Sequence, residues 1–99
     1  MLVLRDTKDP QKIFKYPLDE PITLGRNVDR VNIVIDYNRT ISGKHCDIYA
    51  RNCRFFIRDL NSVNKTYVNG QMVQQETEIR FNYIVALGEV ELSVEIIPL

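Results

Sequence analysis

The sequence predicts an all-β fold, an antiparallel β-sandwich of two sheets whose functional loops gather at one end. Three observations lead to this prediction. β-Branched and aromatic residues recur in short runs along the 99 residues, Asn, Asp, Gly and Pro separate the runs, and no segment carries a sustained helical period. Each sheet must bury one apolar face, so two sheets packed face to face satisfy the pattern.

The expected strands are short runs bounded by turn residues. Residues 54–59 show the alternation best. Phe55 and Ile57 fall on one face of a strand, whereas Arg54, Phe56 and Arg58 fall on the other. We expect Phe55 and Ile57 to face the core. In chain order, the expected strands are residues 1–5, 12–18, 22–25, 32–35, 46–51, 54–59, 67–68, 78–80, 83–87 and 90–97.

Turn residues join neighbouring strands into antiparallel hairpins. Asn52, Asn69-Gly70 and Gly88-Glu89 each lie between two strand-like runs, and such residues are favoured in tight hairpin turns. The chain shows no repeat, linker or low-complexity stretch. We therefore expect residues 1–99 to form a single domain.

Charge and hydropathy exclude two classes of partner. Lys and Arg total 13, and so do Asp and Glu, so no overall field draws the protein to nucleic acid or to an anionic membrane. The N-terminal segment turns polar after Leu4, and no apolar run approaches membrane-spanning length. We expect a cytosolic, monomeric protein.

The cysteines and the single histidine limit metal and redox chemistry. Cys46, Cys53 and His45 are too few for the usual four-ligand zinc site, so we expect neither a metal nor a cofactor. A disulfide is geometrically possible if both cysteines lie near one hairpin, but a cytosolic setting keeps thiols reduced. We expect both cysteines to be packing residues.

Three polar segments carry motifs whose order and spacing fit one family. Gly25-Arg26 comes first, Ser42 and His45 follow, and residues 59–70 read Asp-Leu-Asn-Ser-Val-Asn-Lys-Thr-Tyr-Val-Asn-Gly. Together they resemble the forkhead-associated (FHA) family, whose motifs have the approximate form GR, SxxH and DLGSTNGTxVNG. The resemblance implies a sandwich of the SMAD/FHA type that binds phosphothreonine on a partner protein.

The resemblance also implies which side chains contact the ligand. Arg26 offers a permanently charged, planar guanidinium for two phosphate oxygens, Ser42 a hydroxyl and Lys44 an ammonium. Such a cluster suits a phosphothreonine, which carries about −1.5 to −2 charges and three acceptor oxygens. Asn64 matches the asparagine that holds the peptide backbone, because an amide donates and accepts at once.

Other matched residues are expected to support the loops. Gly25 would permit a turn that a side chain obstructs, His45 would be buried and hydrogen-bonded to loop backbone, and Asp59 would accept backbone N–H bonds. None of them is expected to contact the phosphate. A catalytic role for His45 is disfavoured, because the chain contains no second histidine and a lone histidine more often bonds to buried partners.

The sequence departs from the family pattern around the expected site. Val63 replaces the usual Thr or Ser, so one hydroxyl is missing. Lys65 and Asn61 replace glycines, and Gly43 replaces a larger, commonly polar residue. A lysine at a positive-φ position costs on the order of 1 kcal/mol, offset in part by its charge. Val63 or the apolar surroundings of Ile41 would provide the niche for a threonine methyl group.

Arg30 and Arg39 lie in loops that, in the family, contact side chains beyond the phosphothreonine. Isolated surface charges are normal, so one interpretation is a pair of solvated arginines. The other is that they favour an acidic residue in the ligand, and we include Arg39 among the expected binding residues.

Two alternatives to phosphothreonine binding stay open. Val63, Gly43 and Lys65 support a degenerate FHA-like scaffold that binds an unphosphorylated protein through a sheet face or edge. An enzyme is a more distant alternative, because no nucleophile has a base at hand and no carboxylate pair is evident.

Overall fold

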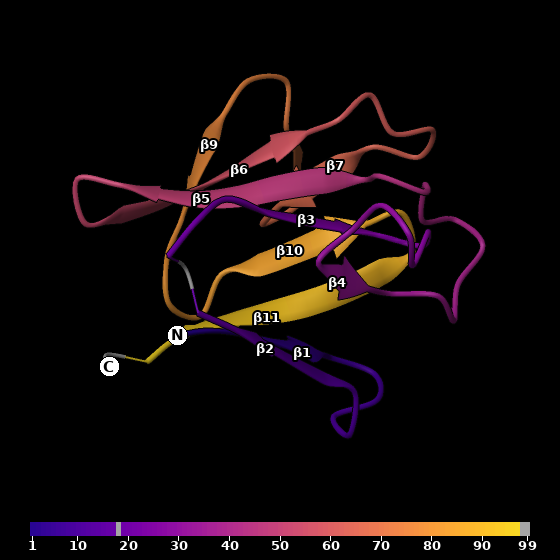
Figure 1. The fold of residues 1–99 in the computed structure, drawn as a ribbon, viewed down its shortest axis with the longest axis horizontal. Coiled ribbons are helices and arrows are strands. Elements are labelled where there is room, and N and C mark those ends of the chain that lie inside the picture. Colours follow the sequence, from indigo (N-terminus) through magenta and orange to yellow (C-terminus); the bar gives the residue numbers. More distant parts are fainter. Residues whose placement is uncertain (18, 98–99) are drawn as a thin grey trace.

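Two β-sheets face each other in the computed structural model, which describes residues 1–17 and 19–97 (Figure 1). The strand orders are β2-β1-β11-β10-β7-β8 and β4-β3-β5-β6-β9, so the predicted all-β sandwich is confirmed. The first sheet contains β1 Leu2–Asp6, β2 Ile13–Tyr16, β7 Thr66–Val68, β8 Gln71–Met72, β10 Ile84–Leu87 and β11 Val90–Ile96. The second contains β3 Ile22–Gly25, β4 Ile33–Val34, β5 Cys46–Arg51, β6 Arg54–Asp59 and β9 Thr77–Ile79.

The strand boundaries agree with the prediction to within a few residues. The expected strand 12–18 is shorter as β2, and its predicted end at Leu18 lies outside the described residues. The short strand β8 was not predicted separately, although the turn before it was. The described ranges 1–17 and 19–97 contain no helix long and apolar enough to cross a membrane.

One strand pair contradicts the fully antiparallel prediction. β3 and β4 pair in parallel, with Gly25 opposite Val34. The reason lies at the start of β4, where Thr23 N–H donates to Asn32 Oδ1 at 2.8 Å and Asn32 N–H donates to the Thr23 carbonyl at 2.9 Å. These bonds hold the beginning of β4 beside β3, and the parallel pairing of Leu24 with Ile33 and of Gly25 with Val34 continues from there.

Rows of β-branched and leucine side chains build the core between the sheets. In the second sheet Ile48 stands opposite both Ile22 and Ile57, and all three are fully buried. Val85 occupies the equivalent central position of the first sheet. Phe55, predicted to face the core with Ile57, is only half-buried and packs against the core cluster. Alternation along each strand places these residues on one face.

Hairpin turns lie where the sequence predicts them. Asn52 and Cys53 have φ values of 53° and 62°, and Asn69 and Gly70 have 49° and 84°. Two consecutive positive φ values are the geometry of a type I′ turn. Cys46 is a buried packing residue as expected, but the packing prediction is wrong for Cys53, which is exposed because it lies at a turn.

Replacing Cys53 by glycine should stabilise the fold. Cys53 occupies the second turn position, where an L side chain is strained and Asn-Gly is the favoured pair. We expect Cys53→Gly to raise the free energy of unfolding by about 1 kcal/mol in urea denaturation. Cys53→Ser keeps the strain and serves as control, so equal stability of the two variants would contradict the prediction.

Candidate functional site

The loops after β3, β4 and β6 meet at one end of the sandwich, on the right in Figure 1. The backbone N–H of Arg26 donates to the Ser42 carbonyl at 3.0 Å, which joins loop 26–32 to loop 35–45. Val63 N–H donates to Ser42 Oγ at 3.0 Å and Asn64 Nδ2 donates to the Thr40 carbonyl at 2.9 Å, which joins loop 60–65 to the same segment. The predicted convergence of Arg26, Ser42 and Asn64 is therefore present.

Gly25 allows the first two loops to touch. A Cβ on Gly25 would lie 2.2 Å from the backbone oxygen of Gly43, closer than any real contact. The glycine is needed for this close approach of two backbones, since its φ is not in the left-handed region. Any side chain here would push the Arg26 loop away from Ser42.

His45 lies fully buried beneath the loops and hydrogen-bonds to loop 35–45 and loop 60–65. Its Nδ1 accepts the backbone N–H of Ser42 at 3.0 Å, so the proton of the neutral ring is on Nε2, which lies 2.9 Å from the Lys65 carbonyl. Burial lowers the pKa of His45, and the Lys65 carbonyl and the Asp59 charge oppose that shift only in part. A neutral imidazole is thus the form that fits.

Asp59 organises loop 60–65 from below. Its carboxylate accepts the backbone N–H of Ser62 at 3.0 Å and the hydroxyls of Ser62 and Thr66 at 2.6 and 2.7 Å. Burial alone would raise the pKa of Asp59, but the hydrogen bonds from Ser62 and Thr66 outweigh it and hold the pKa below its ordinary value. Ser62 and Thr66 are buried and were not singled out from the sequence, although both lie within the motif of residues 59–70.

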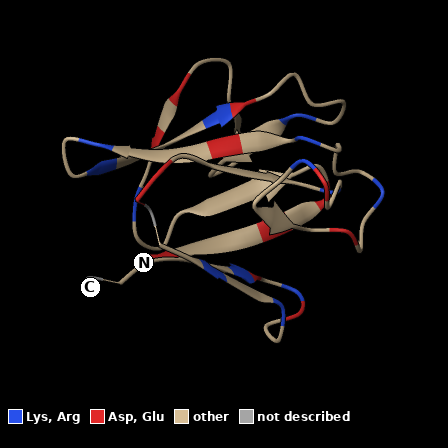
Figure 2. Ribbon diagram, in the orientation of Figure 1, with Lys and Arg blue, Asp and Glu red and all other residues tan. Residues whose placement is uncertain are grey.

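Above these buried groups, the predicted ligand-contacting side chains are open to solvent. Arg26, Arg39, Lys44 and Asn64 are exposed and Ser42 is half-buried. No ion pair engages Arg26, Arg39 or Lys44 within the part of the chain that the structure describes. Figure 2 shows Lys and Arg on several of the loops at this end. The cluster can accept an anion without first breaking an internal salt bridge.

Ser42 and Asn64 each keep hydrogen-bonding capacity. Ser42 Oγ uses a lone pair to accept Val63 N–H, which leaves its hydroxyl proton for another acceptor. Asn64 uses one amide hydrogen on the Thr40 carbonyl, which leaves the second hydrogen and the amide oxygen. Both residues can therefore serve a ligand while holding the loops together.

The residues that depart from the family pattern have distinct environments. Val63 is 81% exposed, whereas Ile41 is 1% exposed and therefore cannot line a niche for a ligand methyl group. Lys65 and Asn61 have φ values of 68° and 62°, so both occupy the left-handed region that the glycines of the family pattern would favour. The Lys65 carbonyl accepts both His45 Nε2 and Gly88 N–H, which fixes that strained backbone.

Comparison with known proteins gives a family and a fold. The family model described as FHA domain matches residues 22–88, more than half of the chain. No curated protein sequence matches significantly.

Several solved structures share the whole fold. The FHA domain of the CT664 protein from Chlamydia trachomatis is 21% identical with a TM-score of 0.86, over 98% of each chain. The FHA domain of an Arabidopsis thaliana hypothetical protein is 24% identical with a TM-score of 0.86, over 98% of this chain and 86% of that one. The N-terminal FHA domain of S. cerevisiae Rad53p, solved with a phosphothreonine peptide, is 18% identical with a TM-score of 0.81, over 94% of this chain and 90% of that one. At these identities the likeness establishes the fold.

Acidification should destabilise the protein through His45. Because the folded-state pKa lies below the ordinary value of 6.5, the unfolded chain binds the proton more tightly. His45 therefore contributes its full stability above about pH 6.5 and loses it as the pH falls toward the folded-state pKa. Melting temperatures should decline between about pH 7.5 and pH 5, the range in which only histidine side chains ordinarily titrate. The melting temperature of His45→Gln should depend less on pH over this range. Equal pH dependence of the wild-type protein and the variant would refute the assignment of this acid sensitivity to His45.

Proposed function

Because the chain belongs to the FHA domain family, we propose that it is a non-catalytic module that binds phosphothreonine on a partner protein. The observation that carries this proposal is the meeting of Arg26, Ser42 and Asn64 at one end of the sandwich, where the Ser42 hydroxyl proton and the second amide hydrogen of Asn64 remain available to a ligand. The phosphothreonine peptide bound by the Rad53p domain gives the ligand class in one protein of the same fold.

The chemistry of the ligand matches this end of the molecule. A phosphothreonine carries about −1.5 to −2 charges, so it needs a fixed cation and several donors. Arg26 supplies the aligned pair of N–H donors, Ser42 a hydroxyl proton, and Lys44 a charge that acts at variable geometry. Asn64 then holds the peptide backbone, with its free amide hydrogen as donor and its oxygen as acceptor.

The absent hydroxyl at Val63 does not remove the phosphate donors. In place of a hydroxyl, Val63 presents an apolar side chain to solvent beside Ser42. Arg39 adds an exposed cation on the loop that carries Ser42 and fits an acidic residue elsewhere in the ligand.

The monomeric state, the cytosolic setting and the single-domain organisation stay predictions.

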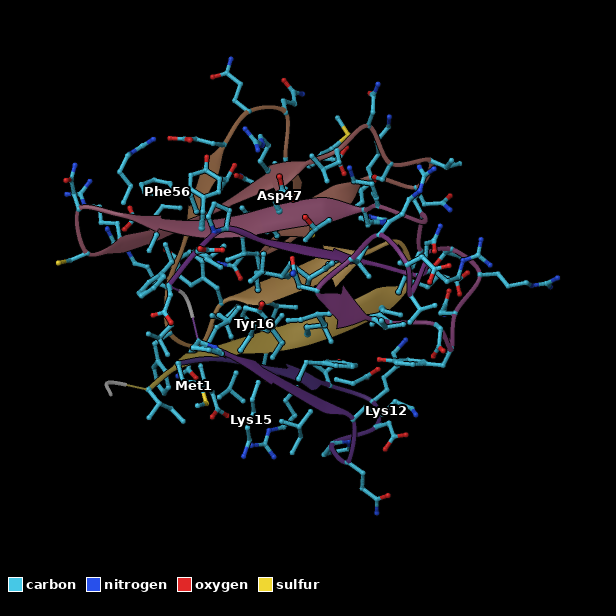
Figure 3. The ribbon with its side chains drawn as sticks, in the orientation of Figure 1. Met1, Lys12, Lys15, Tyr16, Asp47 and Phe56 are labelled. Atoms are coloured by element: carbon cyan, nitrogen blue, oxygen red, sulfur yellow. The ribbon has the colours of Figure 1, made fainter. Side chains whose placement is uncertain are left out.

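The alternative, a scaffold for an unphosphorylated partner, would use a sheet surface. The outer face of β5 and β6 carries Asp47 and Phe56, labelled in Figure 3, with Tyr49 stacked on Phe56 at a ring-centroid distance of 6.0 Å. Arg58 pairs with Asp47 at 2.9 Å, and Arg51 pairs with Glu76 and lies over the Phe56 ring. Arg58 and Arg51 therefore already have acidic partners, whereas Arg26, Arg39 and Lys44 of the loops have none among the described residues, so the loop end is the better candidate for recognition.

Threonine should be preferred over serine in the ligand. The phosphothreonine methyl group needs an apolar neighbour, and Val63 is the exposed apolar residue next to Ser42. One buried methyl contributes about 0.8 kcal/mol, so matched phosphothreonine and phosphoserine peptides should differ about fourfold in affinity by calorimetry. Val63→Ala should reduce the difference. Equal affinities of the wild-type protein for both peptides would refute methyl recognition and leave phosphate binding intact.

Arg26 should be essential for phosphate-dependent binding. Arg26→Ala removes the charged partner and should cost on the order of 2–5 kcal/mol in affinity for a phosphothreonine peptide. Arg26→Lys keeps the charge but loses the paired donors, so it should also bind poorly. The fold should survive both changes, because the Arg26 side chain is exposed.

The matched control for Arg26 is Arg30→Ala in the same loop, which should chiefly change the salt dependence of binding. A degenerate phosphothreonine peptide library and its unphosphorylated counterpart complete the design. Absence of phosphate-dependent binding by folded wild-type protein, or unchanged binding by Arg26→Ala, would favour the scaffold.

A further inference from the structure

Thr40 is bonded within its own loop and to two other segments at the end of the sandwich where the loops meet. Its hydroxyl donates to Asn38 Oδ1 and accepts the backbone N–H of Glu89 at 2.9 Å. Its backbone N–H donates to the same Asn38 oxygen at 2.9 Å, and its carbonyl accepts Asn64 Nδ2 at 2.9 Å. One residue therefore connects loop 35–45, the turn between β10 and β11, and the asparagine of loop 60–65.

The turn between β10 and β11 approaches Thr40 as closely as glycine permits. A Cβ on Gly88 would lie 2.4 Å from Thr40 Oγ1 and 2.7 Å from Thr40 Cβ, and Gly88 has a φ of +58°. Gly88 N–H also donates to the Lys65 carbonyl at 3.2 Å. The turn thus contacts the segments on both sides of the Thr40–Asn64 hydrogen bond and holds them at a fixed separation.

The Thr40 carbonyl determines how the Asn64 amide is presented. The Asn64 side chain is exposed, so without a partner it would sample several rotamers in solvent. The bond to Thr40 selects one arrangement in which the second amide hydrogen and Oδ1 remain available. A side chain held in its binding geometry before the ligand arrives loses less conformational entropy on binding.

We propose that Thr40 is a positioning residue for Asn64, and that the Gly88-Glu89 turn belongs to the recognition site because it fixes the Thr40 hydroxyl. The proposal rests on the proposed function, since it assigns Thr40 a role in the same site. Thr40 acts through its carbonyl, whose position depends on the two hydrogen bonds of its hydroxyl and on its N–H bond to Asn38. It is not proposed to contact the ligand.

Two substitutions separate the hydroxyl from the shape of the side chain. Thr40→Val is nearly isosteric but loses both hydroxyl bonds, whereas Thr40→Ser keeps the hydroxyl. We expect Thr40→Val to bind a phosphothreonine peptide about tenfold more weakly than wild type, the loss typical of one well-placed hydrogen-bonding partner. Thr40→Ser should restore most of the affinity. Melting curves establish that both variants are folded.

A double-mutant cycle tests whether Thr40 works through Asn64. In an Asn64→Ala background, which retains Arg26 and Ser42, Thr40→Val should cause little further loss of peptide affinity in an NMR titration. Wild-type affinity in Thr40→Val, or the same tenfold loss with and without Asn64, would overturn the proposal.

A measurement without ligand keeps the positioning role separate from the proposed function. The order parameter of the Asn64 side-chain amide, measured by 15N relaxation on the free protein, should be high in wild type and Thr40→Ser and lower in Thr40→Val. Failure of wild type to bind any phosphopeptide would refute the proposed function, and an unchanged order parameter in Thr40→Val would refute the positioning role.

Discussion

The end of the sandwich where the three loops meet depends on the buried imidazole of His45. Its two ring nitrogens bond to the backbone of loop 35–45 on one side and of loop 60–65 on the other. The backbone of the same residue continues the connection, because His45 N–H donates to the Leu24 carbonyl and the His45 carbonyl accepts Leu60 N–H. A single residue therefore ties β3 and two loops together. The tautomer is fixed by its partners, so the ring has one orientation that satisfies both loops.

The candidate site consists of a lower layer of buried, hydrogen-bonded polar groups and an upper layer of exposed charges without ion-pair partners among the described residues. Below, the carboxylate of Asp59 accepts three hydrogen bonds from Ser62 and Thr66, and no buried side-chain nitrogen or oxygen of the described residues lacks a partner. Above, Arg26 and Lys44 project charges that no described acidic group neutralises. Buried polar groups are costly unless they are bonded, whereas exposed donors remain free to exchange water for a ligand. The lower layer thus holds the loops rigid, and the upper layer leaves the donors that the proposed phosphothreonine binding requires.

Local sequence signals account for most of the fold. Asn69-Gly70 specifies a type I′ turn by its own backbone preferences, and alternation around Ile57 specifies the buried face of β6. The parallel pairing of β4 was missed because it depends on hydrogen bonds between Thr23 and Asn32, whose pairing no local pattern encodes. The exposure of Cys53 was missed for a related reason: free cysteine is usually buried, and its position at the turn overrode that preference.

For the site, the sequence by itself determined which residue types stand in the loops: a guanidinium at Arg26, a hydroxyl at Ser42, an amide at Asn64 and an imidazole at His45. It also indicated that Lys65 would be strained if its position required a positive φ, and the structure gives that φ as 68°. Only the tertiary structure decided which of these groups are already engaged and which are free. In the structure Ile41 is buried and Val63 is exposed, and a lone pair of Ser42 Oγ accepts Val63 N–H. The Thr40 carbonyl accepts the Asn64 amide, a contact that no motif predicts. The physical reason is that these contacts join segments about 20 or more residues apart, so they are set by strand register and sheet packing instead of by preferences of neighbouring residues.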